Sequence, residues 1–159
     1  MRQLIDGFDR RFRVLDRHSR ELIGNISDEM LFARPRELTR TLTPFSCGEY
    51  ILRSGAMVEK TFGGITTRLW DDPFEWTLPE ALSTTENVLG YLSEVEATRI
   101  AGFGFFKSDE DLSSRIPAPE DLRTLFDILL ETLARAEHFQ GRAFAVFQML
   151  SDEKLPRID

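Results

Sequence analysis

The sequence predicts an all-α protein and, within that class, a four-helix up-down bundle. Apolar side chains recur every three or four positions along four long segments, as on the buried face of an amphipathic helix. No segment shows the sustained polar and apolar alternation that is typical of a half-buried strand. Helices of this kind bury their apolar faces by packing together. With 159 residues, one domain covering residues 1–159 is expected.

The first two helices have clear local signals. Residues 3–24 carry one apolar stripe, with charged side chains on the opposite face. The second helix is expected to begin after Ser46, because Ser46 and Glu49 have the spacing of a capping box. In this motif each side chain accepts a hydrogen bond from the backbone N–H of the other residue. Phe45 and Tyr50 stand where a hydrophobic staple would join them.

The last two helices are predicted from similar signals. Ser83 and Glu86 form a second candidate capping box, which would begin a third helix that runs towards Phe103. The fourth helix is expected to begin near Pro119, since proline is favoured in a first turn and acidic residues follow it. This helix would run for about 30 residues, near the upper limit for a globular protein, and its apolar stripe ends at Phe147.

Net charge and composition exclude several classes of function. The formal charge is −7 and the arginines are interspersed with acidic residues, so the basic surface of a nucleic-acid-binding protein is not expected. The charge also disfavours an anionic membrane, and no apolar run approaches the roughly 20 residues of a spanning helix. The N-terminal residues lack the apolar core of a signal peptide. A single cysteine, Cys47, permits no internal disulfide, and we expect a cytoplasmic protein.

Three short segments stand out beside the helix pattern. Residues 27–31 (SDEML) precede an Arg-Pro pair, residues 46–52 (SCGEYIL) begin the predicted second helix, and residues 138–142 (HFQGR) lie within the fourth. The third segment is the most specific, because a glycine in the middle of a helix is unfavourable. Together these segments resemble the DinB-like family of four-helix bundles, over nearly the whole chain.

The resemblance implies a metal site whose ligands this sequence lacks. Members of the family typically bind a divalent metal through three histidines, and characterised relatives include thiol-dependent S-transferases and isomerases. The matching positions here are Arg53 on the second helix and Arg135 and Phe139 on the fourth. A guanidinium group stays protonated and a phenyl ring has no donor atom, so none of the three can ligate a metal. We therefore expect no metal and no cofactor.

A relocated metal site is the alternative. Zinc usually takes at least three protein ligands, and this chain offers His18, His138 and Cys47 on three different predicted helices. Glu49 and Glu137 could join them only if the bundle brought these residues together. The Glu-x-x-His spacing of di-iron bundles is absent, because an arginine stands three residues before His138. We favour the absence of a metal.

Three residues allow both a chemical and a structural interpretation. Cys47 lies in the first turn of the second helix, where the helix dipole can activate a thiol, but we favour a small buried residue. Glu49 could be a general base, but we favour its role as the capping partner of Ser46. His138 has no second titratable partner at a diagnostic spacing, so we interpret it as a surface or hydrogen-bonded residue.

Two interpretations of Arg53 and Arg135 remain open. The arginines either fill the former metal cavity by pairing with acidic residues or lie solvated on the surface; the candidate partners are Glu49, Glu131 and Glu137. In the first case a pocket that also includes Phe139, His138 and Arg142 would suit a small acid, since arginine binds carboxylates well.

The aromatic loop at residues 70–82 also has more than one interpretation. Trp70, Phe74 and Trp76 could line a ligand mouth or a subunit contact, but for Trp70 we favour a cap on the open end of the bundle.

The favoured function is a metal-free, non-catalytic protein that binds a small molecule or has a structural role, homodimeric as the resemblance implies. The alternative is a transferase or isomerase of the family's type that uses a rebuilt metal site or the Cys47 thiol.

Overall fold

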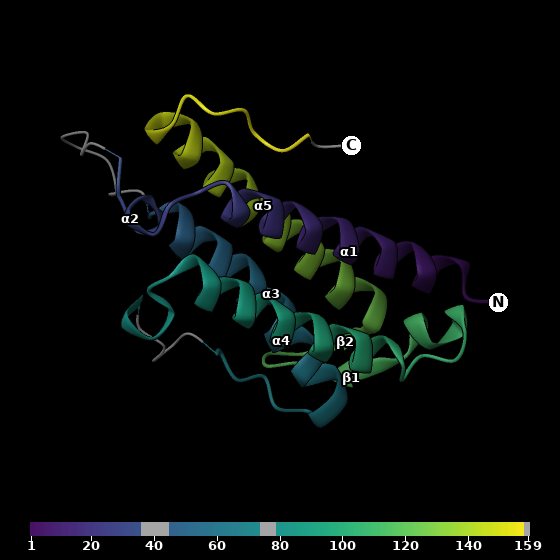
Figure 1. Cartoon of the computed structure of the whole chain (residues 1–159). Helices are drawn as coiled ribbons and strands as arrows, with labels where there is room; N and C mark the ends of the chain where they lie inside the picture. Colours follow the sequence, from purple (N-terminus) through teal and green to yellow (C-terminus); the bar gives the residue numbers. More distant parts are fainter. Residues whose placement is uncertain (36–44, 74–78, 158–159) are drawn as a thin grey trace.

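The computed structural model describes residues 1–35, 45–73 and 79–157 (Figure 1). Over these ranges the structure is all-α, so the predicted fold class is confirmed. The long helices are α1 (Gln3–Gly24), α3 (Cys47–Thr67), α4 (Thr85–Phe103) and α5 (Leu125–Leu150). The short elements are α2 (Asp28–Leu31), two 3-10 helices, η1 (Pro79–Leu82) and η2 (Asp109–Ser113), and the strands β1 (Arg115–Pro117) and β2 (Leu122–Thr124). None of the helices in the described ranges is long and apolar enough to cross a membrane.

The four long helices pack in a ring in which α3 and α4 are neighbours that run in the same direction. The Tyr91 hydroxyl donates to the Glu59 carboxylate across 2.6 Å. Further along both helices, Phe62 packs against Phe103 with ring centroids 4.9 Å apart. Because the residue numbers increase together along the two contacts, α3 and α4 are parallel.

The helices α1 and α5 form a second parallel pair. Phe8 contacts Phe126 near the start of both helices, with ring centroids 5.6 Å apart. The Gln140 side chain then donates to the Leu15 carbonyl oxygen across 2.6 Å further along. In Figure 1 both helices run from the end of the molecule near the N-terminus towards the opposite end, and α5 passes behind α1.

The order of directions is therefore up, down, down, up, and the strictly alternating up-down order expected from the sequence is wrong. The length of the connection between α3 and α4 permits this order. The 21 residues of α3 span about 32 Å at 1.5 Å per residue. An extended chain covers about 3.3 Å per residue, so the segment from residue 68 to residue 84 is long enough to return to the end where α3 began.

An aromatic cluster joins three of the helices in the core. Phe12 of α1 meets Phe62 of α3 edge-on at 5.4 Å, and both contact Phe103 of α4. Gly102 allows this arrangement, because a Cβ atom at that position would lie 2.3 Å from the Phe62 ring. Phe12 and Phe62 are almost completely buried, and burying an aromatic side chain stabilises a fold by roughly 1.5–3 kcal/mol.

An ion network around one buried arginine joins α1 to α4. The Arg99 side chain is only 3% exposed, and its guanidinium group pairs with Asp9 of α1 and approaches Glu96 at 3.9 Å. Arg20 extends the network from α1 by contacting both Asp16 and Glu96. A buried guanidinium is tolerated when carboxylates surround it in this way, because removal of either partner would leave an uncompensated charge.

The predicted helix starts are confirmed at α3 and corrected at α4 and α5. Ser46 caps α3 through the predicted capping box, and Phe45 contacts Tyr50 as the staple predicts. The cap of α4 is Thr84 rather than Ser83. The fourth helix begins at Leu125 rather than near Pro119, because the preceding residues form the antiparallel β1–β2 hairpin and Thr124 then caps the helix.

Candidate functional site

The positions at which the resemblance implies metal ligands lie on and beside the groove between α3 and α5, and aromatic side chains pack around two of them, Arg53 and Phe139. The Phe139 ring stacks on Tyr50 with centroids 6.4 Å apart. Arg53 is exposed, and its guanidinium carbon lies 4.0 Å from the centroid of the Phe45 ring, while Arg142 lies 5.9 Å from that of Tyr50. These five residues, Phe45, Tyr50, Arg53, Phe139 and Arg142, form what we term the aromatic end of the groove. Both arginines make cation–π contacts, and neither has an ion pair with an acidic side chain of the described residues.

The donor chemistry at these positions does not fit a metal. Guanidinium and phenyl groups stand where the resemblance implies imidazoles. The residues of the relocated-metal alternative are also dispersed: His18 and Cys47 are buried on α1 and α3, whereas His138 is exposed on α5. Within residues 1–35, 45–73 and 79–157, no three His, Cys, Asp or Glu side chains gather closely enough to hold a metal ion.

Cys47 is a buried core residue at the start of α3. Its side chain is inaccessible, and burial raises the pKa of the thiol to about 12. Desolvation therefore outweighs any effect of the helix dipole, and the thiol stays protonated at neutral pH. The environment matches the small buried residue favoured from the sequence rather than a nucleophile.

Glu49 is occupied by local contacts. Its Oε2 atom accepts hydrogen bonds from the Ser46 backbone N–H at 2.7 Å and from the Ser46 hydroxyl at 2.8 Å. Its Oε1 atom accepts from Arg34 at 3.1 Å. Partial burial raises the pKa of Glu49, but the Ser46 hydrogen bonds and the Arg34 charge outweigh burial and leave that pKa below its usual value. A carboxylate stabilised in its charged form is a poor general base.

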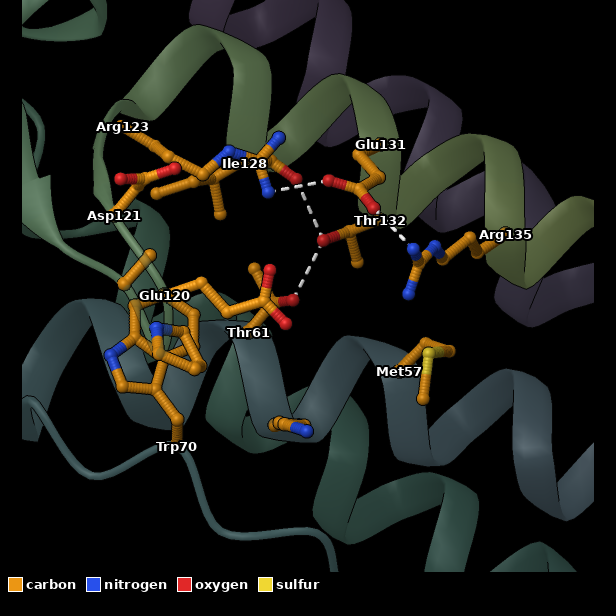
Figure 2. Close-up of a pocket in the computed structure, with 13 residues that line it drawn as sticks. Met57, Thr61, Trp70, Glu120, Asp121, Arg123, Ile128, Glu131, Thr132 and Arg135 are labelled. Carbon is orange, nitrogen blue, oxygen red and sulfur yellow. Dashed lines mark hydrogen bonds and ion pairs between the residues drawn. The ribbon is translucent and has the colours of Figure 1, made fainter.

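A cavity of about 420 Å³ lies further along the same groove, where the β1–β2 hairpin overhangs α3 and α5 (Figure 2). We term it the hairpin pocket. Its lining comes from α3, the segment after α3, the hairpin turn and α5; the residues are Met57, Lys60, Thr61, Trp70, Ala118, Pro119, Glu120, Asp121, Arg123, Ile128, Glu131, Thr132 and Arg135. The volume is within the range of small-molecule sites.

Two arginines converge on one carboxylate at the rim of the hairpin pocket. Glu131 contacts Arg123 at 2.5 Å through Oε2 and Arg135 at 2.6 Å through Oε1 (Figure 2). The Thr61 and Thr132 hydroxyls, 2.7 Å apart, form a buried hydrogen bond behind them. Because Thr132 also donates to the Ile128 carbonyl oxygen, Thr61 is the donor in this pair. Charged side chains therefore line the rim of the pocket, and the uncharged threonine side chains form its floor.

Trp70 forms one wall of the hairpin pocket. Its indole ring packs directly on Gly64, where an added Cβ atom would lie 2.3 Å from the ring. The indole N–H donates to the Pro117 carbonyl oxygen across 3.1 Å and ties the wall to β1. Trp70 thus covers the end of the bundle, as favoured from the sequence, and also lines a cavity. Phe74 and Trp76, named with it, lie outside the described residues.

A second cavity of about 440 Å³ joins the hairpin pocket to the aromatic end. The two cavities share Met57, Glu131 and Arg135, and the second is completed by Ala134, His138 and Phe139. Of the pocket predicted from the sequence, Arg135, His138 and Phe139 are brought together here. Glu49, Arg53 and Arg142 do not line either cavity.

Several residues that line the hairpin pocket were not predicted from the sequence. Thr61, Thr132 and Arg123 were not candidates, although Glu131 and Arg135 have the i, i+4 spacing at which opposite charges pair on a helix. Arg123 could not be found by spacing, because its place beside Glu131 depends on the hairpin. Glu137, the other acidic candidate, pairs instead with Arg11 of α1 at 3.0 Å.

Comparisons with known proteins do not extend this description. The chain matches no protein-family model, no curated protein and no solved structure.

Proposed function

We propose that this protein is a metal-free, non-catalytic binding protein that holds a small organic acid in the hairpin pocket. One observation carries the proposal: Arg123 and Arg135 share a single carboxylate, Glu131, at the rim of a cavity of about 420 Å³. Two guanidinium groups around one carboxylate leave one positive charge uncompensated. Lys60 adds another, since no carboxylate of the described residues lies within 4.0 Å of its ammonium group.

The arginines have hydrogen-bonding capacity to spare. Each guanidinium carries five N–H donors, of which Glu131 occupies a minority. Guanidinium groups bind carboxylates by paired, charge-assisted hydrogen bonds, which are stronger than neutral ones. The apolar side chains of Met57 and Ile128 offer contacts to the rest of a small ligand. A carboxylate with a short apolar body is complementary to this arrangement.

The experiment compares carboxylates with their uncharged amides. Isothermal titration calorimetry would measure the binding of hexanoate and benzoate against hexanamide and benzamide. We expect each acid to bind at least 10-fold more tightly than its amide, because only the acid accepts charge-assisted hydrogen bonds. Arg135→Gln and Arg123→Gln should each weaken acid binding about 10-fold, which corresponds to about 1.4 kcal/mol. Arg10→Gln, which removes an exposed arginine outside the pocket, is the matched control.

Two results would contradict the acid-binding proposal. One is the absence of binding by every acid in the panel. The other is equal binding of acid and amide, because the arginines would then make no contribution to recognition.

The proposal also includes descent from the DinB-like bundles with loss of the metal. Support comes from the placement of Arg135 and Phe139 one turn apart on α5, at the margin of a groove shared with α3. The test is the triple variant Arg53→His, Arg135→His and Phe139→His. We expect it to gain stoichiometric nickel or zinc binding, measured by titration and elemental analysis, while the natural sequence binds neither metal. A triple variant that folds but binds no metal contradicts the resemblance, and metal bound by the natural sequence contradicts the metal-free function.

We further propose that the protein is a cytoplasmic homodimer. The support for the dimer is an exposed apolar strip along α1 and α5, in which Leu4, Phe126 and Leu130 are 40–56% exposed beside Phe8. Clustered exposed apolar side chains are typical of association surfaces. Leu130→Glu should convert a dimer into a monomer in sedimentation experiments, whereas the same change at exposed Leu69 should not. For the cytoplasm, the support is the single buried thiol of Cys47.

A further inference from the structure

We infer that the acid held in the hairpin pocket also carries an amine, so that the ligand is a zwitterion with its two charges separated by several bonds. This inference rests on the proposed function and names the ligand class of the same site. The reason is the distribution of charge in the pocket, which differs between its two ends (Figure 2).

The turn at the hairpin end of the pocket carries two carboxylates, while Arg123 of the same hairpin extends to Glu131 of α5 (Figure 2). Glu120 and Asp121 lie in the turn between β1 and β2, which closes through a 2.9 Å hydrogen bond from the Ala118 backbone N–H to the Asp121 carbonyl oxygen. Both side chains are exposed and line the cavity. No Lys, Arg or His of the described residues lies within 4.0 Å of either carboxylate. These two carboxylates are therefore available to a cationic ligand group.

Trp70 adds a second feature that favours a cation at this end. Figure 2 shows its indole ring beside Glu120 and Asp121, at the opposite end of the pocket from Arg135 and Met57. The ring is held in place by Gly64 behind it and by its hydrogen bond to the Pro117 carbonyl oxygen. A tryptophan face attracts ammonium groups, and nearby carboxylates attract the same groups by charge. One fixed indole and two unpaired carboxylates together recognise an organic cation.

Only a ligand with both charges is complementary to the whole pocket. The pocket contains three cationic and three anionic side chains, and Glu131 is already shared by Arg123 and Arg135. The remaining charges are about two positive at the α3–α5 side and two negative at the hairpin end. A simple acid would leave the hairpin carboxylates without a partner, and a simple amine would leave the arginines and Lys60 without one. A zwitterion provides a partner for both sets of charges.

The test uses ω-amino acids of increasing length with matched single-charge compounds. The series runs from 4-aminobutanoate to 8-aminooctanoate, each compared by calorimetry with the carboxylate and the primary amine of the same length. We expect the best amino acid to bind at least 5-fold more tightly than its acid or its amine. The double variant Glu120→Gln and Asp121→Asn should remove this advantage while leaving the binding of the acid unchanged or improved. Asp152→Asn with Glu153→Gln, an exposed pair outside the pocket, is the matched control.

The outcomes separate this inference from the proposed function. If the acids bind as tightly as the amino acids and the double variant has no effect, the zwitterion is wrong and acid binding stands. If neither acids nor amino acids bind, or if only the amines bind, both proposals are overturned. A 5-fold preference that survives the double variant also overturns the inference, because the hairpin carboxylates would not be its source.

Discussion

The two ends of the groove between α3 and α5 differ in how side chains fill the space between the two helices. At the aromatic end, the Phe139 and Tyr50 rings occupy the space between the helices, and arginines pack over Phe45 and Tyr50 as cation–π partners. At the hairpin pocket, short threonine side chains form the floor and a cavity of about 420 Å³ remains. The positions implied by the resemblance fall at both ends, since Arg135 lines the hairpin pocket and Arg53 packs on Phe45, so the resemblance does not mark which end is open. Side-chain volume decides which end is open.

The largest expected effect is at the aromatic end. Tyr50→Ala should lower the free energy of unfolding by about 3 kcal/mol, because removal of a buried aromatic side chain loses its burial and leaves a cavity. Urea denaturation measures this loss. Phe105→Ala is the control, since Phe105 is 62% exposed and should change stability by less than about 0.5 kcal/mol. If both variants are equally stable, the aromatic end does not support the fold.

A substitution at the wall of the hairpin pocket should lower the stability of the fold almost as much. Gly64→Ala places a Cβ atom 2.3 Å from the Trp70 ring, so the ring must move and stability should fall by about 2 kcal/mol. Gly63→Ala is a control one residue away, where the nearest atom is at 3.8 Å. It should stabilise the helix by about 0.5 kcal/mol. Tryptophan fluorescence and thermal unfolding measure both effects, and identical behaviour of the two variants would exclude the Trp70 contact.

A smaller effect depends on pH. The pKa of Glu49 is lowered in the folded protein, so its contribution to stability is present above its unfolded value of 4.5 and is lost as the pH falls through the folded value. Glu49→Gln should therefore cost about 1 kcal/mol at pH 7 and reduce the loss of stability below pH 4.5. Unfolding curves at pH 3 to 7 test this, with Glu153→Gln as a control. If the stability of Glu49→Gln depends on pH in the same way as that of the natural sequence, this prediction is wrong.

The smallest expected effect is a gain. Gly141 lies exposed in the interior of α5, and no atom would lie within 4 Å of an added Cβ. Gly141→Ala should raise the unfolding free energy by about 0.5–1 kcal/mol, because alanine favours helix. A loss of stability would show that the glycine permits a close contact, for example in a dimer.

The features predicted correctly are those that depend on neighbouring residues. The capping box at Ser46 involves contacts within four residues, so the local sequence contains all the participants. The start of α4 was misplaced by one residue because Ser83, Thr84 and Thr85 are similar capping candidates. Asp28 of α2 accepts a hydrogen bond from the Thr85 backbone N–H across 2.8 Å, a distant contact that favours the observed cap.

The site was predicted only in part for the same reason. Arg135 and Glu131 share one helix, so their pairing follows from spacing. Arg123, Trp70 and Lys60 come from other elements, and only the fold brings them to the same cavity.

By itself, the sequence determined the four long helices, the absence of histidines at the positions where the resemblance implies metal ligands, and the local capping of α3. These features depend on residue identity and on interactions between near neighbours. The tertiary structure decided the parallel pairing of α3 with α4, the position of the cavity and the capping of α1. At that last site, Asp109 accepts hydrogen bonds from the Leu4 and Ile5 backbone N–H groups. These features join residues far apart in the chain, whose proximity depends on how the apolar faces of all the helices are buried together.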